Sequence, residues 1–469
     1  MNPSADKYKK LFSNTAIMAI GSFGAKILSF FLLRLYTGVL TEAEYGIADL
    51  IYQTVNILYP ILTVSMADAV IRFGLDRGYS NKRVFSNALF VSFSGLTLFA
   101  FVTPALGKIE EFTGLLIYLY LSCFFSCLRQ VTAIFVRSAG MVKLFAADGI
   151  LATVTIVIGN VAFLVGLNLG VKGYLLSIIL SDFCSILFLF FVGNLKRFID
   201  FKRINGKILG RMIRYSLPLV PTYVLWWITS ASDRFFVIYY IGETQNGVYS
   251  AAYKIPTLLM IFTNLFFQAW QMSAIENKDD KELADFYGKI YNSYISLLFL
   301  ACCGLVMIAQ PLSDIMLDTS KEFAESYLYT APLILATAFQ CGCQFLSSVY
   351  NLKKKSVNSC LTALCAAGMN ILLNFLFIPR FGVMGAAAAT VCAYAVCFIV
   401  RLIDTTRMVH FKPQNFRTFI NTIITVGSVL ICISVSHNKI LWLAAVFAVC
   451  LIVNISPLLR TFRKIIKRV

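Results

Sequence analysis

The chain has 469 residues, of which 59% are hydrophobic and only 14% are charged, and its formal net charge is +18. Its mean hydropathy of +0.77 excludes an ordinary soluble globular protein, in which roughly a quarter of the residues are charged. The positive charge gathers in short stretches such as residues 196–214 and 460–469, which fit the anionic surface of a bilayer, so no nucleic acid is needed as a partner.

Apolar stretches long enough to cross a bilayer, which takes roughly 20 residues, occur from one end of the chain to the other. We predict fourteen transmembrane helices and therefore an all-α polytopic membrane protein. In chain order they cover residues 11–38, 46–71, 84–107, 113–136, 144–169, 173–195, 213–241, 247–272, 286–309, 324–350, 357–378, 382–403, 416–436 and 439–459. The last two helices could pack as a loose appendage.

The distribution of lysine and arginine predicts the orientation of these helices, because both residues favour cytoplasmic loops. Placing the N-terminus in the cytoplasm assigns most of the 41 lysines and arginines to cytoplasmic loops and leaves very few outside. We therefore expect a multi-pass protein with both termini cytoplasmic. The first apolar stretch carries Lys26 and Arg34 and is expected to be a retained span rather than a signal peptide.

Two pairs of segments repeat in the same order at a spacing of about 210 residues, which corresponds to six helices. FFLLRLYTGVLTEAEYG (30–46) compares with FFVIYYIGETQNGVY (235–249), and NVAFLVGLNLGVKG (160–173) compares with NFLFIPRFGVMG (374–385). Chance similarity between apolar segments is the alternative. The repeat predicts two parallel six-helix bundles. We expect an N-terminal lobe at 1–195, a basic cytoplasmic linker at 196–212, a C-terminal lobe at 213–410, and two additional helices with a basic tail at 411–469.

Charged residues inside the predicted spans are candidate functional groups, because charge at membrane depth is costly. The cations are Lys26, Arg34, Arg129, Arg234 and Lys254, and the acids are Asp49, Asp68, Asp148, Asp182 and Asp233. Lys26 and Asp182 lie near the expected midplane. Arg234 and Lys254 lie at similar depth on consecutive helices.

A guanidinium or ammonium group in a confined cavity of low dielectric constant attracts phosphate strongly. We therefore expect an anionic substrate to bind the cavity cations, which are Lys26, Arg129, Arg234, Lys254 and, as a weaker candidate, Arg34. The acids Asp182, Asp233, Asp49 and Asp68 are candidate coupling-ion ligands or counter-ions.

Structural roles are the alternative for several of these residues. Asp68 and Arg72 are four residues apart, which favours an ion pair within one helix, and Asp148 near the inner surface is expected to be structural. Asp233 could serve only as a counter-ion for Arg234 or Lys254.

Catalytic and metal sites are not indicated by the sequence. There is no Walker A loop for ATP, His410 and His437 are far apart, and the thirteen cysteines lie in or beside apolar segments without metal-ligand spacing. We expect no catalytic residue, no metal site and no cofactor, with a Na⁺ or H⁺ gradient, or the substrate gradient itself, as the source of energy.

Three segments carry a family resemblance: FGAKILSFFLLRLYTGVLTEAEYGIADLI (23–51), SDRFFVIYYIGETQNGVYSAAYKIP (232–256) and FGVMGAAAAT (381–390). They resemble the Wzx-type polysaccharide flippases of the multidrug/oligosaccharidyl-lipid/polysaccharide (MOP) exporter superfamily. The resemblance implies two six-helix lobes around a central cavity. It also implies alternating access that moves an undecaprenyl-pyrophosphate-linked oligosaccharide from the inner to the outer leaflet of the bacterial cytoplasmic membrane.

The resemblance also implies partners and residue roles. Besides the lipid-linked oligosaccharide and membrane lipids, the partners would include a polysaccharide polymerase and other assembly proteins. Asp233 and Arg234 match the SDR-like pair of the family, and Lys254 matches its Y-K element. The family often has a proline followed four residues later by an arginine, whereas this chain has Arg34 and Gly38 there, so no role carries over to Arg34.

Two other functions remain open from the sequence. An ion-coupled exporter of small drugs or metabolites could use the same architecture, although an exporter of cations would favour an acidic cavity. A membrane enzyme such as a glycan polymerase would need acid–base residues on a sizeable outside loop, and the sequence has no such loop. We therefore expect a transporter and no enzyme.

Overall fold

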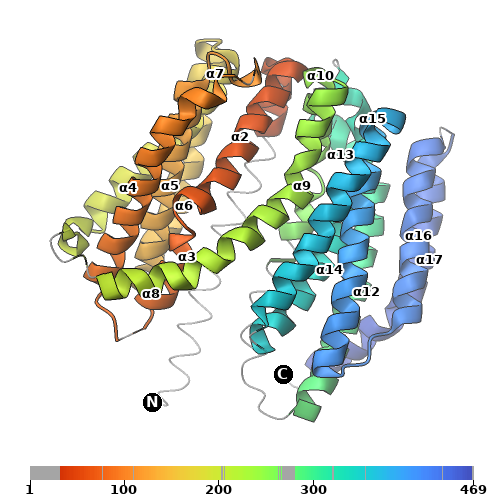
Figure 1. Cartoon of the computed structure of the whole chain (residues 1–469). Helices are drawn as coiled ribbons and strands as arrows, with labels where there is room; N and C mark the ends of the chain where they lie inside the picture. The colour runs from red at the N-terminus through yellow and green to blue at the C-terminus, as the bar shows by residue number, and fades with distance from the viewer. Residues whose placement is uncertain are drawn as a thin grey trace. The chain divides into compact units, whose positions relative to one another are not determined.

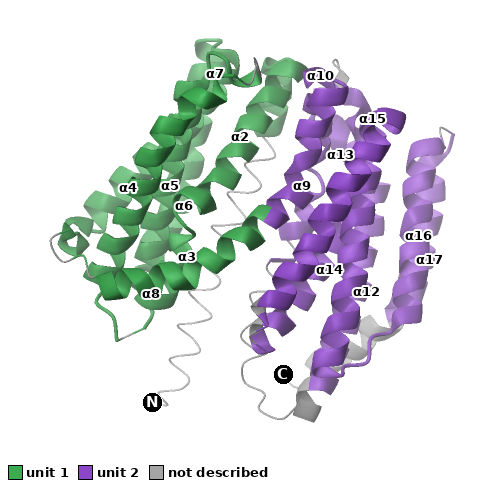
Figure 2. Ribbon diagram, in the orientation of Figure 1, with its two compact units in different colours: residues 1–224 green, residues 225–469 purple. Residues whose placement is uncertain are grey.

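The computed structural model describes residues 32–76, 78–108, 110–201, 204, 206–261, 263–264, 266, 280–318, 322–353, 355–435 and 437–466. Over these residues the protein consists of helices and the turns between them, with no strand (Figure 1). The chain forms two compact units, residues 1–224 and residues 225–469 (Figure 2). The division falls inside one helix, α9 (Val220–Tyr240). The expected four-part division of the chain stays a prediction.

Unit 1 is a helical bundle. Its helices are α2 (Glu42–Leu62), α3 (Met66–Gly74), α4 (Asn81–Leu106), α5 (Leu116–Ser138), α6 (Val142–Asn160), α7 (Gly170–Val192) and α8 (Gly206–Ser216). A π-helical turn, Val161–Gly166, extends α6. Helix α2 starts with a capping box, because Glu44 N–H donates to Thr41 Oγ1 at 3.2 Å and Thr41 N–H donates to Glu44 Oε2 at 2.9 Å.

The span predicted over residues 46–71 is not one straight helix, because α2 and α3 meet at a bend of 53°. The break includes Val64 and Ser65, whose φ angles of 51° and 50° lie in the left-handed region. Gly95 of α4 lies against the end of α2, and a Cβ atom at Gly95 would be 1.9 Å from the carbonyl oxygen of Leu62. The backbones therefore meet at a point where no side chain fits.

Unit 2 contains most of α9. Its other described helices are α10 (Glu243–Ala252), α12 (Asp280–Met307), α13 (Ala309–Met316), α14 (Ser326–Lys353), α15 (Ser356–Val409), α16 (Asn415–Ser434) and α17 (Lys439–Ile466). The predicted helix at 247–272 is interrupted by a turn at residues 253–256. Pro256 explains the interruption, because proline lacks an amide N–H and disfavours helical geometry in the residue before it.

Helix α15 is a hairpin of two helices, as the predicted spans at 357–378 and 382–403 require. Its 54 residues fold back at Gly382, whose φ of 59° and ψ of −143° are not helical and are readily adopted only by glycine. Arg401 Nε donates to Thr362 Oγ1 at 3.0 Å and Asn370 Nδ2 donates to Thr390 Oγ1 at 3.4 Å. These contacts hold the two halves side by side.

The C-terminal helices α16 and α17 pack against α12 and are therefore not a loose appendage. Asn421 and Asn454 exchange two amide hydrogen bonds of 2.9 and 2.7 Å between α16 and α17, and both side chains are fully buried. Paired amides of this kind join membrane helices through polar contacts.

Eight of the described helices are long and apolar enough to cross a membrane, and the bent pair α2 and α3 would make nine. One of the eight is the α15 hairpin, which contains two of the predicted spans. The protein is thus an all-α polytopic membrane protein. The full count of fourteen stays a prediction, because some of the predicted spans include residues outside the described ranges.

Candidate functional site

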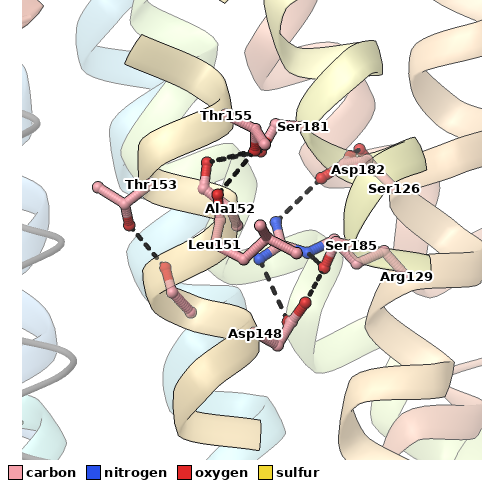
Figure 3. A network of polar contacts seen from close by, with 11 residues as sticks. Ser126, Arg129, Asp148, Leu151, Ala152, Thr153, Thr155, Ser181, Asp182 and Ser185 are labelled. Atoms are coloured by element: carbon pink, nitrogen blue, oxygen red, sulfur yellow. Dashed lines mark hydrogen bonds and ion pairs between the residues drawn. The ribbon is translucent and has the colours of Figure 1, made fainter. Parts of the chain in front are cut away.

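An ion-pair cluster joins three helices of unit 1 (Figure 3). Arg129 of α5 contacts Asp182 of α7 with an Nη1–Oδ1 distance of 2.9 Å and Asp148 of α6 with an Nη2–Oδ2 distance of 3.6 Å. Arg129 Nε also donates to Ser185 Oγ at 2.9 Å. Ser126 donates to the second oxygen of Asp182, and Ser185 donates to the second oxygen of Asp148. All four carboxylate oxygens therefore have a partner.

Helical spacing explains why these five residues meet. Ser126 and Arg129 are three residues apart on α5, as are Asp182 and Ser185 on α7, so each pair lies on one face of its helix. Helices α5, α6 and α7 pack against one another, which brings Asp148 of α6 to the same place. Arg129 and Asp182 are candidates from the sequence, whereas Asp148 is a residue for which a structural role was expected. The structure shows that Asp148 shares its arginine with Asp182.

The charges in this cluster do not cancel, because two carboxylates face one guanidinium. The side chains of Asp148 and Asp182 are 3% and 7% exposed, whereas that of Arg129 is 29% exposed. The acids are thus hidden and the arginine is reachable from outside the cluster. Arg129 is not free to bind a phosphate while both carboxylates hold it.

A second polar cluster, in unit 2, surrounds Asp233 of α9, which is completely buried. Its Oδ2 accepts hydrogen bonds from Tyr249 at 2.7 Å, Thr390 at 2.7 Å and Tyr253 at 3.4 Å, and its Oδ1 accepts one from Asn374 at 3.4 Å. All of these donors are neutral. Asp233 forms no ion pair within the described residues. Its environment therefore differs from that of a simple counter-ion, which would contact Arg234 or Lys254 directly.

The α15 hairpin adds further oxygen atoms to the Asp233 cluster, from the side chains of Asn370 and Asn374. Asn370 Oδ1 accepts from Ser232 at 2.9 Å and from Asn374 at 3.1 Å. The buried Oδ1 of Asn374 has no hydrogen-bond partner in the described part of the chain. Carboxylate, amide and hydroxyl oxygens are the ligands that hard cations prefer. The arrangement could therefore receive a proton or a small cation, although the described residues contain no group of three or more His, Cys, Asp or Glu side chains that could hold a metal ion.

The two predicted cations of unit 2 lie close to this cluster in sequence but have different environments. Arg234 is 3% exposed, its Nη1 donates to the carbonyl oxygen of Ser230 at 3.0 Å, and its guanidinium lies 4.6 Å from the centre of the Tyr253 ring. Lys254 is half-buried in the turn after α10. Lys254 is thus the more accessible of the two for an anion.

Arg401 is a functional candidate that is not evident from the sequence, because it lies at the edge of a predicted span, next to a basic cytoplasmic loop. The side chain is completely buried. It donates to Thr362 Oγ1 at 3.0 Å and to the carbonyl oxygens of Cys343 at 3.0 Å and Ser359 at 3.2 Å. The guanidinium lies 4.8 Å from the ring centre of Trp226 and 5.5 Å from that of Tyr350.

The structure gives other environments to the remaining predicted residues. The Tyr223 hydroxyl donates to the Asp68 carboxylate and lies 3.1 and 3.0 Å from its two oxygens. Within the described residues Asp68 forms no ion pair with Arg72, which corrects that expectation. Asp49 is buried and Arg34 is exposed. Lys26 lies outside the described residues.

Solved structures of transporters share this fold at low sequence identity. The lipid II flippase MurJ in an inward closed conformation is 17% identical with a TM-score of 0.69, and the match covers 96% of this chain and 100% of that one. An inward-facing multidrug resistance MATE family transporter of the MOP superfamily is 16% identical with a TM-score of 0.64, covering 83% and 98% of the two chains. A MOP superfamily transporter from Pyrococcus furiosus is 17% identical with a TM-score of 0.61, covering 84% and 94%.

The fold of the chain is therefore the MOP superfamily fold, as the sequence resemblance implied. No curated protein sequence matches the chain significantly. Residues 35–325, which are more than half of the chain and contain the Arg129 cluster, Asp233, Arg234 and Lys254, match the family described as "Polysaccharide biosynthesis protein". The fold of the chain is shared with solved transporter structures, and the chain belongs to this family of polysaccharide biosynthesis proteins.

Proposed function

We propose that the protein is a flippase that moves undecaprenyl-pyrophosphate-linked oligosaccharide units from the inner to the outer leaflet of the bacterial cytoplasmic membrane. It would work by alternating access during surface polysaccharide synthesis, with both termini in the cytoplasm. The observation that carries the proposal is the membership of residues 35–325 in a polysaccharide biosynthesis family, on a fold that matches the lipid II flippase MurJ over 96% of this chain.

The chemistry of a pyrophosphate-linked lipid fits the cations of both units. A pyrophosphate is a strong acceptor for ammonium and guanidinium groups. Lys254 in unit 2 is half-buried and Arg34 in unit 1 is exposed, so an anion can reach both side chains. Arg234 and Lys26 are proposed as further anion ligands. Membrane lipids and a polysaccharide polymerase are the proposed partners.

The Asp233 cluster is the proposed site of the coupling ion in unit 2. Its carboxylate is buried and accepts hydrogen bonds from neutral hydroxyl and amide groups, and a buried negative charge held only by neutral donors favours the binding of a mobile cation. Either Na⁺ or H⁺ could be the ion. Asp49 and Asp68 of unit 1 are proposed only as secondary candidates, because Asp68 is already engaged by Tyr223.

The proposal is tested with purified protein in liposomes that contain a fluorescent polyprenyl-pyrophosphate oligosaccharide. An impermeant reductant added outside reports how fast the labelled lipid crosses the bilayer. Lys254→Ala should slow flipping by about tenfold or more, because a hydrogen bond to a charged group contributes roughly 1.5–3 kcal/mol, whereas Lys254→Arg should retain flipping. Lys289→Ala is the matched control, since it removes an exposed lysine from the same unit.

Two results would count against the proposal. Flipping at the wild-type rate by Lys254→Ala and by Arg234→Gln would show that these cations do not hold the pyrophosphate. Efflux of organic cations from the same liposomes, without flipping of the labelled lipid, would favour the small-molecule exporter, because multidrug resistance transporters share the fold.

A further inference from the structure

The Arg129 cluster of unit 1 carries one negative charge too many for its surroundings. Asp148 and Asp182 share a single guanidinium, and within the described residues neither acid pairs with a second cation. Both carboxylates are almost completely buried in helices long enough to span a membrane. Uncompensated charge is costly there, so the cluster would be stabilised by one additional positive charge.

We propose that the Arg129–Asp148–Asp182 cluster is a proton-binding site that holds one proton, shared between the two carboxyl groups. Two carboxylates at one site cannot both remain ionised at low cost. Binding one proton leaves one carboxylate and one guanidinium, which form a neutral pair. The two protonation steps belong to the pair of acids rather than to either residue alone.

A proton fits this site and a metal ion does not, because the carboxylate oxygens are already engaged. Arg129 and Ser126 occupy the two oxygens of Asp182, and Arg129 and Ser185 occupy those of Asp148 (Figure 3). A hard cation such as Ca²⁺ needs six or more oxygen ligands, and Mg²⁺ needs a complete octahedron. A proton needs only one oxygen atom and can lie within an existing hydrogen bond.

The serine hydroxyls allow the proton to enter without breaking the cluster. When a proton from water adds to the carboxylate oxygen of Asp182 that faces Ser126, the new O–H can donate to Ser126 Oγ, whose own hydrogen then turns to another acceptor. A hydroxyl group has one donor and two acceptor positions, so the reversal keeps the contact. No bond to carbon changes, and the only species transferred is H⁺.

An independent observation supports this site on the same face of α5. Ser122 lies four residues before Ser126 and seven before Arg129, a spacing that places all three on one side of the helix. Its side chain is 2% exposed, and its hydroxyl has no hydrogen-bond partner among the described residues. An unpartnered buried hydroxyl one turn from Ser126 is available to accept or pass on a hydrogen bond from the cluster.

Other titratable groups on neighbouring helices do not replace the missing positive charge. Cys127 of α5 lies near Asp182, and Tyr59 of α2 lies near Cys127. Of the charged groups on the helices that pack against α5, Lys82 pairs with Asp200 at 3.2 Å. Besides Asp148 and Asp182, these helices carry Glu42, Glu44 and Asp49 on α2, Asp68 and Arg72 on α3, Lys82 and Arg83 on α4, Lys143 on α6 and Lys172 on α7. None of the described groups gives Asp148 or Asp182 a second cation.

The consequence for transport follows from the exposure of Arg129. With one proton bound, a single carboxylate holds the guanidinium, and with two bound none does, so the arginine can turn toward an anion. This step deepens the proposed function and depends on it, since it assumes an anionic substrate. The proton site itself requires no substrate and can be tested alone.

The test is an infrared titration of the protein in lipid nanodiscs, from about pH 4 to about pH 9, a range that includes the ordinary titration of carboxyl and imidazole groups. The carbonyl stretch of a protonated carboxyl group is followed. At about pH 7 the wild type should show one protonated carboxyl group that Asp148→Asn/Asp182→Asn lacks. Asp200→Asn, which removes the acid of the Lys82 ion pair, is the control and should leave that band unchanged.

Single variants keep the test decisive when the double variant does not fold. Ser126→Ala should shift the frequency of the carboxyl band, because one carboxyl group loses a hydrogen bond. In Arg129→Gln the band should persist to higher pH than in the wild type, because the positive charge that favours the ionised carboxylates is gone. Absence of any cluster-dependent band at every pH would overturn the proton site, and loss of the band on adding Na⁺ at constant pH would overturn the choice of ion. A normal band together with absent lipid flipping would instead refute only the proposed function.

Discussion

Replacing Arg129 by methionine is expected to destabilise unit 1 strongly. The two ion pairs have N–O distances of 2.9 and 3.6 Å, which correspond to gross attractions of roughly 6 and 5 kcal/mol at an effective dielectric constant of about 20 for whichever carboxylate is ionised. Most of this attraction is offset by the cost of taking the charges out of water. Removal of one partner from a buried ion pair nevertheless costs about 3–5 kcal/mol, because an uncompensated charge remains.

The size of the loss should depend on the two acids that remain. Arg129→Met/Asp148→Asn/Asp182→Asn has no charge in the cluster and should recover stability to within about 1 kcal/mol of the wild type, since neutral replacements of buried ion pairs are often tolerated. Lowering the pH should also reduce the defect of Arg129→Met. In that variant the folded state binds more protons than the unfolded state, so its stability falls as the pH rises.

The assay is unfolding by sodium dodecyl sulfate in mixed micelles, followed by far-ultraviolet circular dichroism at two pH values. The reasoning would be refuted if Arg129→Met were as stable as the wild type, or if the triple variant were less stable than the single one. Either result would mean that the guanidinium does not compensate Asp148 and Asp182.

Three further substitutions test contacts elsewhere in the fold by the same unfolding assay. Gly95→Ala should lose about 1–3 kcal/mol or more, because its Cβ would lie 1.9 Å from the carbonyl oxygen of Leu62, and wild-type stability would contradict the close approach of α4. Arg401→Lys should lose about 2 kcal/mol, because an ammonium group cannot make the same forked hydrogen bonds and ring stacking, and an unchanged midpoint would exclude this role. Asn421→Leu should lose about 1–3 kcal/mol by leaving the Asn454 amide unpaired, whereas Asn421→Leu/Asn454→Leu should be nearly neutral, and equal losses in both variants would contradict the pairing.

Apolar length and charge predicted the fold class, because the cost of exposing backbone polar groups to lipid leaves few structures open to such a chain. The α15 hairpin was predicted with its turn near Gly382. The breaks within α2/α3 and at residues 253–256 were not. Hydropathy measures whether a segment can lie in lipid and carries no information on a bend, which depends on contacts with other helices such as that of Gly95 with Leu62.

For the candidate residues, too, the sequence gives no information on contacts between helices. Sequence position identified Arg129, Asp182, Asp233 and Arg234 as costly charges, but it could not pair them, since the partners are far apart in the chain. Asp148 was expected to be a structural residue near the inner membrane surface, and its pairing with Arg129 depends on the packing of α5, α6 and α7. Arg401 lies within about three residues of a predicted helix end, and predicted ends are uncertain by about that much. The sequence therefore cannot show whether this arginine lies in a loop or inside the helix bundle.

The two units hold buried charge in different ways, and the difference bears on how transport would be driven. In unit 1 the acids share one arginine, whereas in unit 2 Asp233 and Arg401 are each held by neutral partners. Under the proposed function an anionic lipid moves outward while a proton or Na⁺ moves inward. Outward movement of negative charge is electrically equivalent to inward movement of positive charge, so the two steps have the same sign. Each elementary charge moved across a potential of 100 mV contributes about 2.3 kcal/mol. A membrane potential that is negative inside would therefore assist both steps. The Arg129 cluster and the Asp233 cluster could each alternate between an anionic form and a neutral, cation-bound form. Such sites would allow the protein to carry the cation inward on the return step, when no substrate is bound.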